Sequence, residues 1–327
     1  MSGVEIKTIN PAEDGMRLDR WFKEHYPALG HGALQKLLRT GQVRIDGSRA
    51  KAGDRVSAGQ SVRVPPLPDH APSRPKPRVS DNDAKWLQSL IIHRDEDVLA
   101  LNKPTGLAVQ GGTKTERHLD GMLDALILDA AERPRLVHRL DRDTSGVLLL
   151  ARNRQAATTL AQSFKSREAL KVYWAIVRGV PKPWAGTINL PLKKVGHAGD
   201  QRVAPAERGD EAGQHAVTDY MVLAHAGKRA AFVALSPRTG RTHQLRAHMA
   251  ALGHPIIGDR KYGGEEALLG DEIDPMLHLH ARGLAMEHPR KGRLRIIAQP
   301  SDHFRRSMSY LGFTEPKDDP FAPFAEI

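Results

Sequence analysis

Five ionisable side chains within six consecutive positions form the most distinctive segment of this 327-residue chain. Residues 138–143 read His-Arg-Leu-Asp-Arg-Asp, and Thr-Ser-Gly follows at 144–146. Neighbouring arginines stabilise the ionised form of a carboxylate, so Asp141 is suited to act as a nucleophile or a general base. The same residues also fit a solvated turn with surface ion pairs, and this segment alone leaves both interpretations open.

The elements around this segment predict that it lies at the edge of a sheet. Residues 147–150 (Val-Leu-Leu-Leu) predict a buried strand, and the Thr-Ser-Gly before them is typical of a turn. A scaffold of this kind can hold polar groups over a cleft at the strand end.

A second polar segment, residues 236–249, combines a turn containing Pro and Gly with the start of a helix predicted over 241–251. Free N–H groups at a helix start favour anions, so the arginines here suit a phosphate or carboxylate partner. Two further stretches are a strand exit into a Pro-x-Gly turn at 102–109 and a strand at 171–177 that carries Tyr173. Taken singly, each stretch also fits an ordinary surface or core position.

Six prolines in residues 65–84 predict an extended linker that divides the chain into two domains. In the first domain, residues 17–26 and 33–39 predict amphipathic helices, and Asp46-Gly47 predicts a hairpin with a type I′ turn. We expect a small domain over 14–66, the linker over 67–86, a large domain over 87–300 and a poorly ordered tail over 301–327.

The large domain is predicted to be α+β, with a mixed, largely antiparallel sheet and flanking helices, beside a small N-terminal α+β domain. Its strands are not regularly separated by crossover helices, which argues against a doubly wound sheet. Strands are expected at 90–93, 98–102, 147–150, 171–177, 230–235, 277–281 and 293–297, and helices at 118–131, 155–167 and 241–251.

Composition narrows the possible partners and locations. A net charge of +11 and a pI near 9.9 favour a polyanionic partner such as nucleic acid. The absence of cysteine excludes disulfides, thiol catalysis and thiolate metal sites. No apolar stretch approaches the 18 residues of a membrane span, and the first residues lack the apolar core of a signal peptide. We therefore expect a cytoplasmic protein with no membrane contact.

In this order, the segments resemble the motifs of the RluA family of RNA pseudouridine synthases. The family's central motif, His-Arg-Leu-Asp followed by Thr-Ser-Gly, stands here at 138–146. Its late motif, Gly-Arg-Thr-His-Gln-Leu-Arg, stands at 240–246, with Gly-His-Pro-Ile at 253–256 and Gly-Asp-x-x-Tyr-Gly at 258–263. The resemblance covers nearly all of residues 88–300 and is nearest to the RluC kind, the enzymes of large-subunit rRNA.

The resemblance implies a role for each matching residue. Asp141 corresponds to the catalytic aspartate that acts on a flipped-out uridine, and Arg139 to the arginine that enters the vacated helix position. Tyr173 corresponds to the tyrosine that packs on the base, and Arg246 to the arginine that pairs with the catalytic carboxylate. The implied reaction turns the base and joins C5 to C1′, by attack at C1′ or by removal of the 2′ proton. It requires no metal and no cofactor.

The small domain resembles the S4 RNA-binding domain, the usual companion of this family. It has Gly-His-Gly at 30–32 where that domain often carries a Ser-Arg pair. The implied partner is RNA, with 23S ribosomal RNA as the expected substrate of a monomeric enzyme. The resemblance implies RNA contacts from five basic residues: Arg17, Arg20, Lys36, Arg39 and Arg44.

Other hypotheses remain open at this level. A retaining glycosidase would use Asp141 and Asp143 as its carboxylate pair. A non-catalytic rRNA-binding or ribosome-assembly factor would share the affinity for RNA but would not need Asp141. Metal binding is not expected, because His243 and His248 lie about 140° apart on a helix of about 3.6 residues per turn.

Overall fold

The computed structural model describes residues 3–67, 79–111, 117–196, 202–207 and 209–324. The chain forms two compact units, Met1–Arg78 and Val79–Ile327. Most of the expected linker falls on 68–78, outside the described residues. Its end differs from the expectation, because helix α3 (Asp81–Ser89) begins before residue 87. The Ser80 side chain caps this helix by accepting from the backbone N–H of Asp83.

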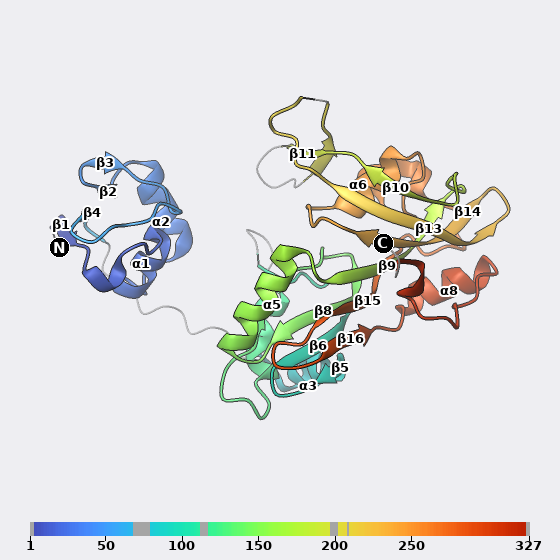
Figure 1. Ribbon diagram of the computed structural model, residues 1–327, viewed down its shortest axis with the longest axis horizontal. Coiled ribbons are helices and arrows are strands. Elements are labelled where there is room, and N and C mark those ends of the chain that lie inside the picture. The colour runs from blue at the N-terminus through green and yellow to red at the C-terminus, as the bar shows by residue number, and fades with distance from the viewer. Residues whose placement is uncertain (1–2, 68–78, 112–116, 197–201, 208, 325–327) are drawn as a thin grey trace. The chain divides into compact units, whose positions relative to one another are not determined.

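The smaller unit packs two helices against a four-stranded antiparallel sheet, drawn in blue in Figure 1. Helix α1 (Leu18–His25) buries Leu18, Trp21 and Phe22, the face that their spacing predicts. Asp46 and Gly47 have φ angles of 46° and 78°, and positive φ at both positions is what a type I′ turn requires. The other elements are β1 (Glu5–Thr8), η1 (Pro11–Glu13), α2 (His31–Arg39), β2 (Arg44–Ile45), β3 (Ser48–Arg49) and β4 (Ser61–Val64), with the sheet order β1-β4-β2-β3.

Among the described residues, the larger unit contains one ten-stranded mixed sheet. The strands, in sheet order, are β10 (Ala185–Asn189), β13 (Val217–Ala226), β14 (Ala230–Pro237), β9 (Leu170–Arg178), β15 (Leu279–Glu287), β8 (Ser145–Ala151), β6 (Val98–Lys103) and β5 (Ile91–Arg94), with β16 (Arg293–Ile297) beside β15 and β7 (Arg135–Leu136) beside β8. Of these described strands, β15 and β8 pair in parallel and all other neighbours pair antiparallel. The predicted α+β class with a mixed, largely antiparallel sheet is confirmed.

Helices cover both faces of the sheet because its central strands are apolar on both faces. In β8, Leu148 packs with α3 and α4 (Leu119–Met122), whereas Leu149 packs with α5 (Arg154–Ser166), which lies beside β8 in Figure 1. The remaining elements are η2 (Leu123–Leu126), α6 (Gln244–Ala251), α7 (Arg260–Gly263), η3 (Gly264–Ala267), α8 (Asp302–Tyr310), η4 (Ala322–Phe324), and a separate antiparallel pair of β11 (Leu192–Val195) and β12 (Arg202–Pro205).

Two sequence expectations are wrong. The helix expected over 118–131 is limited to α4 and η2, because Leu128 adopts a φ of 52° that a helix cannot continue through. The expected poorly ordered tail over 301–327 instead contains α8, and Phe321 and Phe324 beyond it are buried in the core. Burial of these aromatic rings stabilises the segment, although its prolines suggested disorder.

Candidate active site

Asp141 lies in the loop between β7 and β8, with its side chain 23% exposed. Gly146 holds this loop close to the sheet, with a φ of 108°. A Cβ at this position would lie 2.2 Å from the carbonyl oxygen of Ala281, because β15 runs parallel to β8 here. Glycine is therefore required where β8 begins, and the Thr-Ser-Gly sequence fixes the start of the strand behind Asp141.

Lys103 anchors the same loop from β6. Its buried ammonium group donates to the carbonyl oxygens of Pro104, Leu107 and Arg142, each at 2.9 Å. Burial lowers the pKa of Lys103 to about 7, and the charges of Asp143 and Asp141 oppose that shift. The sequence interpretation treated this stretch as a strand exit and missed the anchor. The sequence feature that could have indicated this anchor is a lysine at the end of a buried strand, directly before Pro-x-Gly.

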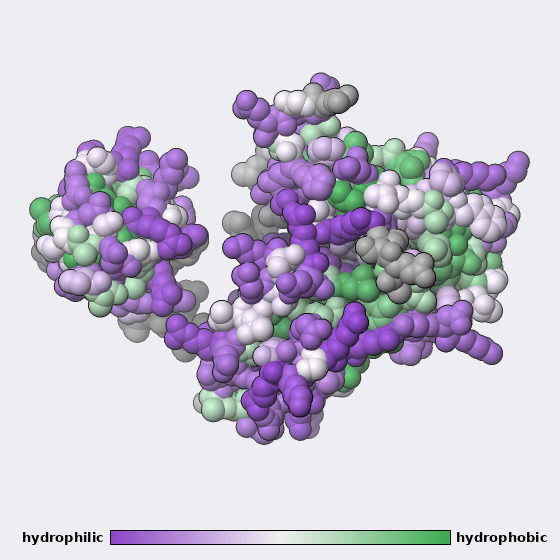
Figure 2. Space-filling model, in the orientation of Figure 1, coloured by the Kyte–Doolittle hydropathy of each residue, from purple (hydrophilic) through white to green (hydrophobic). Residues whose placement is uncertain are grey.

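Arg139, Asp141, Tyr173 and Arg246 line one cavity of about 450 Å³ in the larger unit. They come from the β7–β8 loop, strand β9 and helix α6, which are distant in the sequence. The structure therefore brings together the four residues singled out in the large domain. Figure 2 shows hydrophilic residues gathered over the face of the larger unit beside α5.

Tyr173 stands in β9, opposite Leu235 of β14 and Ala281 of β15. Burial raises the pKa of its phenol, and the negative charge of Asp141 adds to that shift. The phenol is therefore neutral at physiological pH, and its ring forms part of the cavity wall.

Arg246 differs from the expected arrangement. Its Nε and Nη2 donate to the two carboxylate oxygens of Asp259 at 2.8 and 2.7 Å, and both side chains are buried. Asp259 is also the N-cap of α7, where it accepts from the backbone N–H of Tyr262. The expectation that Arg246 pairs directly with Asp141 is wrong, because this bidentate bond occupies its guanidinium. Arg246 acts on Asp141 through its charge.

His243 is a cavity residue that the sequence interpretation considered only as a possible metal ligand. Its Nε2 lies 3.9 Å from Oδ2 of Asp141, and its Nδ1 lies 2.9 Å from Oη of Tyr262. Burial lowers the pKa of His243, although the charge of Asp141 opposes that shift. The available signal was its place in the Gly-Arg-Thr-His-Gln-Leu-Arg motif.

His138 has a structural role. Its Nε2 accepts the backbone N–H of Leu149 at 2.8 Å, and its ring stacks on Phe164 with centroids 4.5 Å apart. Burial lowers the pKa of His138 to about 3, so the imidazole is neutral and its Nε2 can act as an acceptor. His138 thereby fastens the segment before Asp141 to β8 and α5.

Four further basic residues line the same cavity. Lys165 and Arg167 come from the end of α5, Lys171 from β9, and Arg241 from the segment before α6. Burial lowers the pKa of Lys171, and the charge of Arg167 lowers it further. Of these, the sequence interpretation singled out neither Lys165 nor Arg167, since charges at a helix end are common surface features.

A second cavity, of about 460 Å³, shares Asp141, His243 and Arg246 with the first. Asp143 lines this second cavity but not the first. Within the described ranges, no group of three or more histidines or carboxylates is placed to hold a metal ion, and no helix could cross a membrane.

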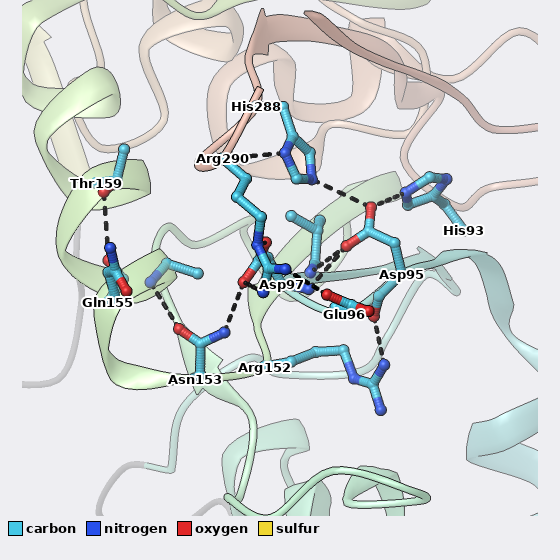
Figure 3. Close-up of polar contacts among 12 residues, drawn as sticks. His93, Asp95, Glu96, Asp97, Arg152, Asn153, Gln155, Thr159, His288 and Arg290 are labelled. Atoms are coloured by element: carbon cyan, nitrogen blue, oxygen red, sulfur yellow. Dashed lines mark hydrogen bonds and ion pairs between the residues drawn. The ribbon is translucent and has the colours of Figure 1, made fainter. Parts of the chain in front are cut away.

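Another ionisable cluster joins the β5–β6 turn to the loop before β16 (Figure 3). Nε2 of His93 and Nε2 of His288 lie 2.8 and 3.3 Å from the same oxygen of Asp95. Arg290 pairs with Asp97 and Glu96 across the two segments. None of the described residues in this cluster lines either cavity, so its charges serve to join elements of the sheet.

Comparisons with known proteins agree with the site. A family model described as RNA pseudouridylate synthase matches residues 97–251. The chain is 34% identical to an uncharacterised RNA pseudouridine synthase of Synechocystis, covering 91% of this chain and 89% of the relative. It is also 34% identical to ribosomal large subunit pseudouridine synthase C of Vibrio vulnificus, covering 88% and 89%.

Among solved structures, human RNA pseudouridylate synthase domain containing 4 is similar, with a TM-score of 0.61 and 32% identity. The similarity covers 72% of this chain and 97% of the human chain. The extent of these matches and the cavity around Asp141 show that this chain belongs to the RNA pseudouridine synthases, enzymes that isomerise uridine to pseudouridine in RNA.

Proposed function

We propose that this enzyme converts specific uridines of 23S ribosomal RNA to pseudouridine, with Asp141 as its catalytic residue. The observation that carries the proposal is the cavity of about 450 Å³, in which Asp141 is the one carboxylate among the described lining residues. The relatives named ribosomal large subunit pseudouridine synthase C support rRNA as the substrate.

One carboxylate is sufficient for the isomerisation. An Asp141 oxygen either attacks C1′ or removes the 2′ proton, and the bond between N1 and C1′ breaks. The base then turns and C5 bonds to C1′, while the bond from C1′ to Asp141 breaks in the first path or the 2′ proton returns to C2′ in the second. C5 loses its proton and N1 gains one. Atoms and electrons balance without an oxidant or a group donor. Asp143, which a glycosidase pair would require, hydrogen-bonds to Arg142 and does not line this cavity.

The other cavity residues suit a flipped nucleotide. Unstacking a base costs a few kcal/mol, and an arginine that fills the vacancy offsets part of that cost. Arg139 is placed for this role at the cavity wall. The Tyr173 ring offers a stacking surface, worth about 1–3 kcal/mol per base. Arg246 contributes positive charge near Asp141 and lies with its guanidinium carbon 5.1 Å from the Tyr262 ring centroid.

The smaller unit is proposed to be an S4-like RNA-binding domain. Arg17 and Arg20 pair with Asp19 and Glu24, and Arg44 donates to backbone carbonyl oxygens. The side chains of Lys36 and Arg39, in the last turn of α2, form no hydrogen bond or ion pair with another described residue. These two cations are therefore the best placed of the five for phosphate. We further propose that the enzyme acts as a monomer in the cytoplasm, where ribosomes assemble.

The decisive experiment replaces Asp141 with Asn, which keeps the shape of the side chain but removes its charge. Pseudouridine formation in rRNA should be abolished, while folding and most RNA binding remain. Asp143→Asn is the matched control in the same loop and should retain most activity. Activity at the wild-type rate in Asp141→Asn would refute the assignment. Mapping rRNA pseudouridines in cells with and without the protein identifies the modified positions.

A further inference from the structure

His243 is held in a conformation that few residues adopt. At the N-cap of α6 it has φ 51° and ψ 22°, in the left-handed region, where non-glycine residues are uncommon and asparagine, aspartate and histidine are the most frequent of them. Its side chain is only 11% exposed. Backbone strain of this kind persists where surrounding contacts over-determine it, and such positions concentrate at functional sites. Here the strained residue directs Nε2 toward Asp141.

The contacts of Tyr262 favour one of the two tautomers of His243. Oη of Tyr262 accepts the backbone N–H of Val203, in β12, at 3.0 Å. Its own hydroxyl proton is then available to Nδ1 of His243, 2.9 Å away. With Nδ1 as the acceptor, the single proton of a neutral imidazole resides on Nε2. The opposite tautomer would place a lone pair against the Asp141 carboxylate.

The surroundings favour a neutral His243 imidazole and a protonated Tyr262 hydroxyl. Burial lowers the pKa of His243; the charge of Asp141 opposes the shift, and that of Arg246 supports it. Burial raises the pKa of Tyr262, so the phenol keeps its proton. Arg246 donates its Nε and Nη2 to Asp259, so the bidentate face of its guanidinium is directed at Asp259 and not at Asp141.

We propose that His243 is a positioning residue that orients the Asp141 carboxylate with its Nε2–H, and that Tyr262 and β12 fix the proton on Nε2. The inference rests on Asp141 being the catalytic residue. The separation of 3.9 Å is longer than a hydrogen bond, and such contacts often tighten only when substrate is bound. The β11–β12 pair, which lies outside the main sheet, thereby becomes part of the site's supporting structure.

Kinetics of four variants at His243 and Tyr262 test the proposal. His243→Phe removes the donor and should lower kcat about 10–100-fold, as expected for residues that orient a reacting group, with KM for RNA within about 3-fold. His243→Gln keeps an N–H at a similar reach and should recover most of the loss. Tyr262→Phe should cause a smaller loss. The double variant His243→Phe/Tyr262→Phe should be no slower than His243→Phe alone, whereas additive losses would overturn the chain of contacts.

Nitrogen-15 NMR of labelled histidine reports which tautomer His243 adopts. A purely structural role of Tyr262 would leave that tautomer unchanged. Wild-type His243 should show the Nε2–H tautomer at neutral pH, and Tyr262→Phe should show a mixture of tautomers. An Nδ1–H tautomer in the wild type would overturn the proposal. His254→Phe is the control for the activity assay, since His254 bonds to the carbonyl oxygen of Arg178 and lines neither cavity.

The failure of this inference is distinguishable from the failure of the proposed function. If Asp141→Asn is inactive while His243→Phe keeps the wild-type kcat, the role of His243 is refuted and that of Asp141 stands. If Asp141→Asn forms pseudouridine at the wild-type rate, the proposed role of Asp141 is refuted, and this inference fails with it.

Discussion

At the residue scale, the cavity separates groups that must be charged from groups that must be neutral. Asp141 stands among cations, whereas the Tyr173 phenol is kept neutral by burial and by the charge of Asp141. The imidazoles of His138 and His243 are also driven toward their neutral forms by burial. Among the described residues that line the cavity, Asp141 is therefore the one group with a negative charge.

Tyr173 allows stacking and proton chemistry to be tested separately. If its role is to stack on the base, Tyr173→Phe should keep KM and kcat within about 3-fold, while Tyr173→Leu should weaken binding by about 1–3 kcal/mol. Steady-state kinetics with an rRNA fragment measure both constants. A large loss of kcat in Tyr173→Phe would instead show that the hydroxyl takes part in the reaction.

At the element scale, single residues and one short helix hold the loops of the site in place in the larger unit. Lys103 at the end of β6 and Gly146 at the start of β8 pair with each other and together hold the end of the Asp141 loop. The four-residue helix α7 supplies both Asp259 and Tyr262 to the site. These residues act by bonding to backbone carbonyl oxygens or by capping a helix. Their effect therefore depends on where they stand and not on the length of the element that carries them.

Helix α2 gives a prediction for RNA binding by the smaller unit. Replacing Lys36 and Arg39 together with Gln should weaken binding similarly across RNA sequences, because phosphate contacts carry no sequence information. The slope of log affinity against log salt should become shallower by roughly 1 for each phosphate that is no longer neutralised. Filter binding at several salt concentrations measures this slope. Arg20→Gln is the matched control, since Arg20 already pairs with Glu24, and an equal effect there would contradict the assignment.

The sequence predicted the elements with strong periodicity and missed those set by tertiary contacts. The strand at 293–297 matches β16 to the residue, since its apolar and charged side chains alternate clearly. The helix over 118–131 was overextended because only the backbone reveals the positive φ of Leu128. The four motif residues do meet in one cavity, yet the partner of Arg246 could not be predicted. From the sequence alone, Asp141 and Asp259 are equally good acceptors for Arg246, and only the placement of α7 beside α6 in the fold distinguishes them.

At the scale of the whole molecule, buried histidines link stability to pH. Burial lowers the pKa of His138 to about 3, and the pKa values of His278 and His280 to about 4. The hydrogen bond of His138 requires a neutral ring, because its Nε2 accepts the backbone N–H of Leu149. Nδ1 of His280 is bonded to the Ser145 hydroxyl in a fully buried position, where a charged ring is costly. All three lie in the larger unit, where His278 and His280 are fully buried.

The folded state should therefore lose stability as the pH falls. Above pH 6.5 these histidines are neutral in both the folded and unfolded states and cost nothing. Below it the unfolded chain binds protons that the folded chain excludes, so the free energy of unfolding should fall between pH 6.5 and about 4 by about 1.4 kcal/mol per pH unit for each proton. Urea unfolding across this range measures the slope. His280→Asn should flatten it by about one proton, and an unchanged slope would contradict the neutral state.

The parallel pairing of β8 with β15 also bears on how the enzyme is made. Ser145 lies opposite His280, 135 residues later in the chain. During synthesis, the Asp141 loop therefore lacks the neighbour that fixes it until β15 has left the ribosomal exit tunnel. The smaller unit, whose core is drawn from its own residues alone, can acquire its structure long before that point. A nascent chain would thus hold a formed smaller unit while the cavity around Asp141 is still unassembled. If the smaller unit binds RNA as proposed, the ability to bind RNA would arise before the ability to modify it.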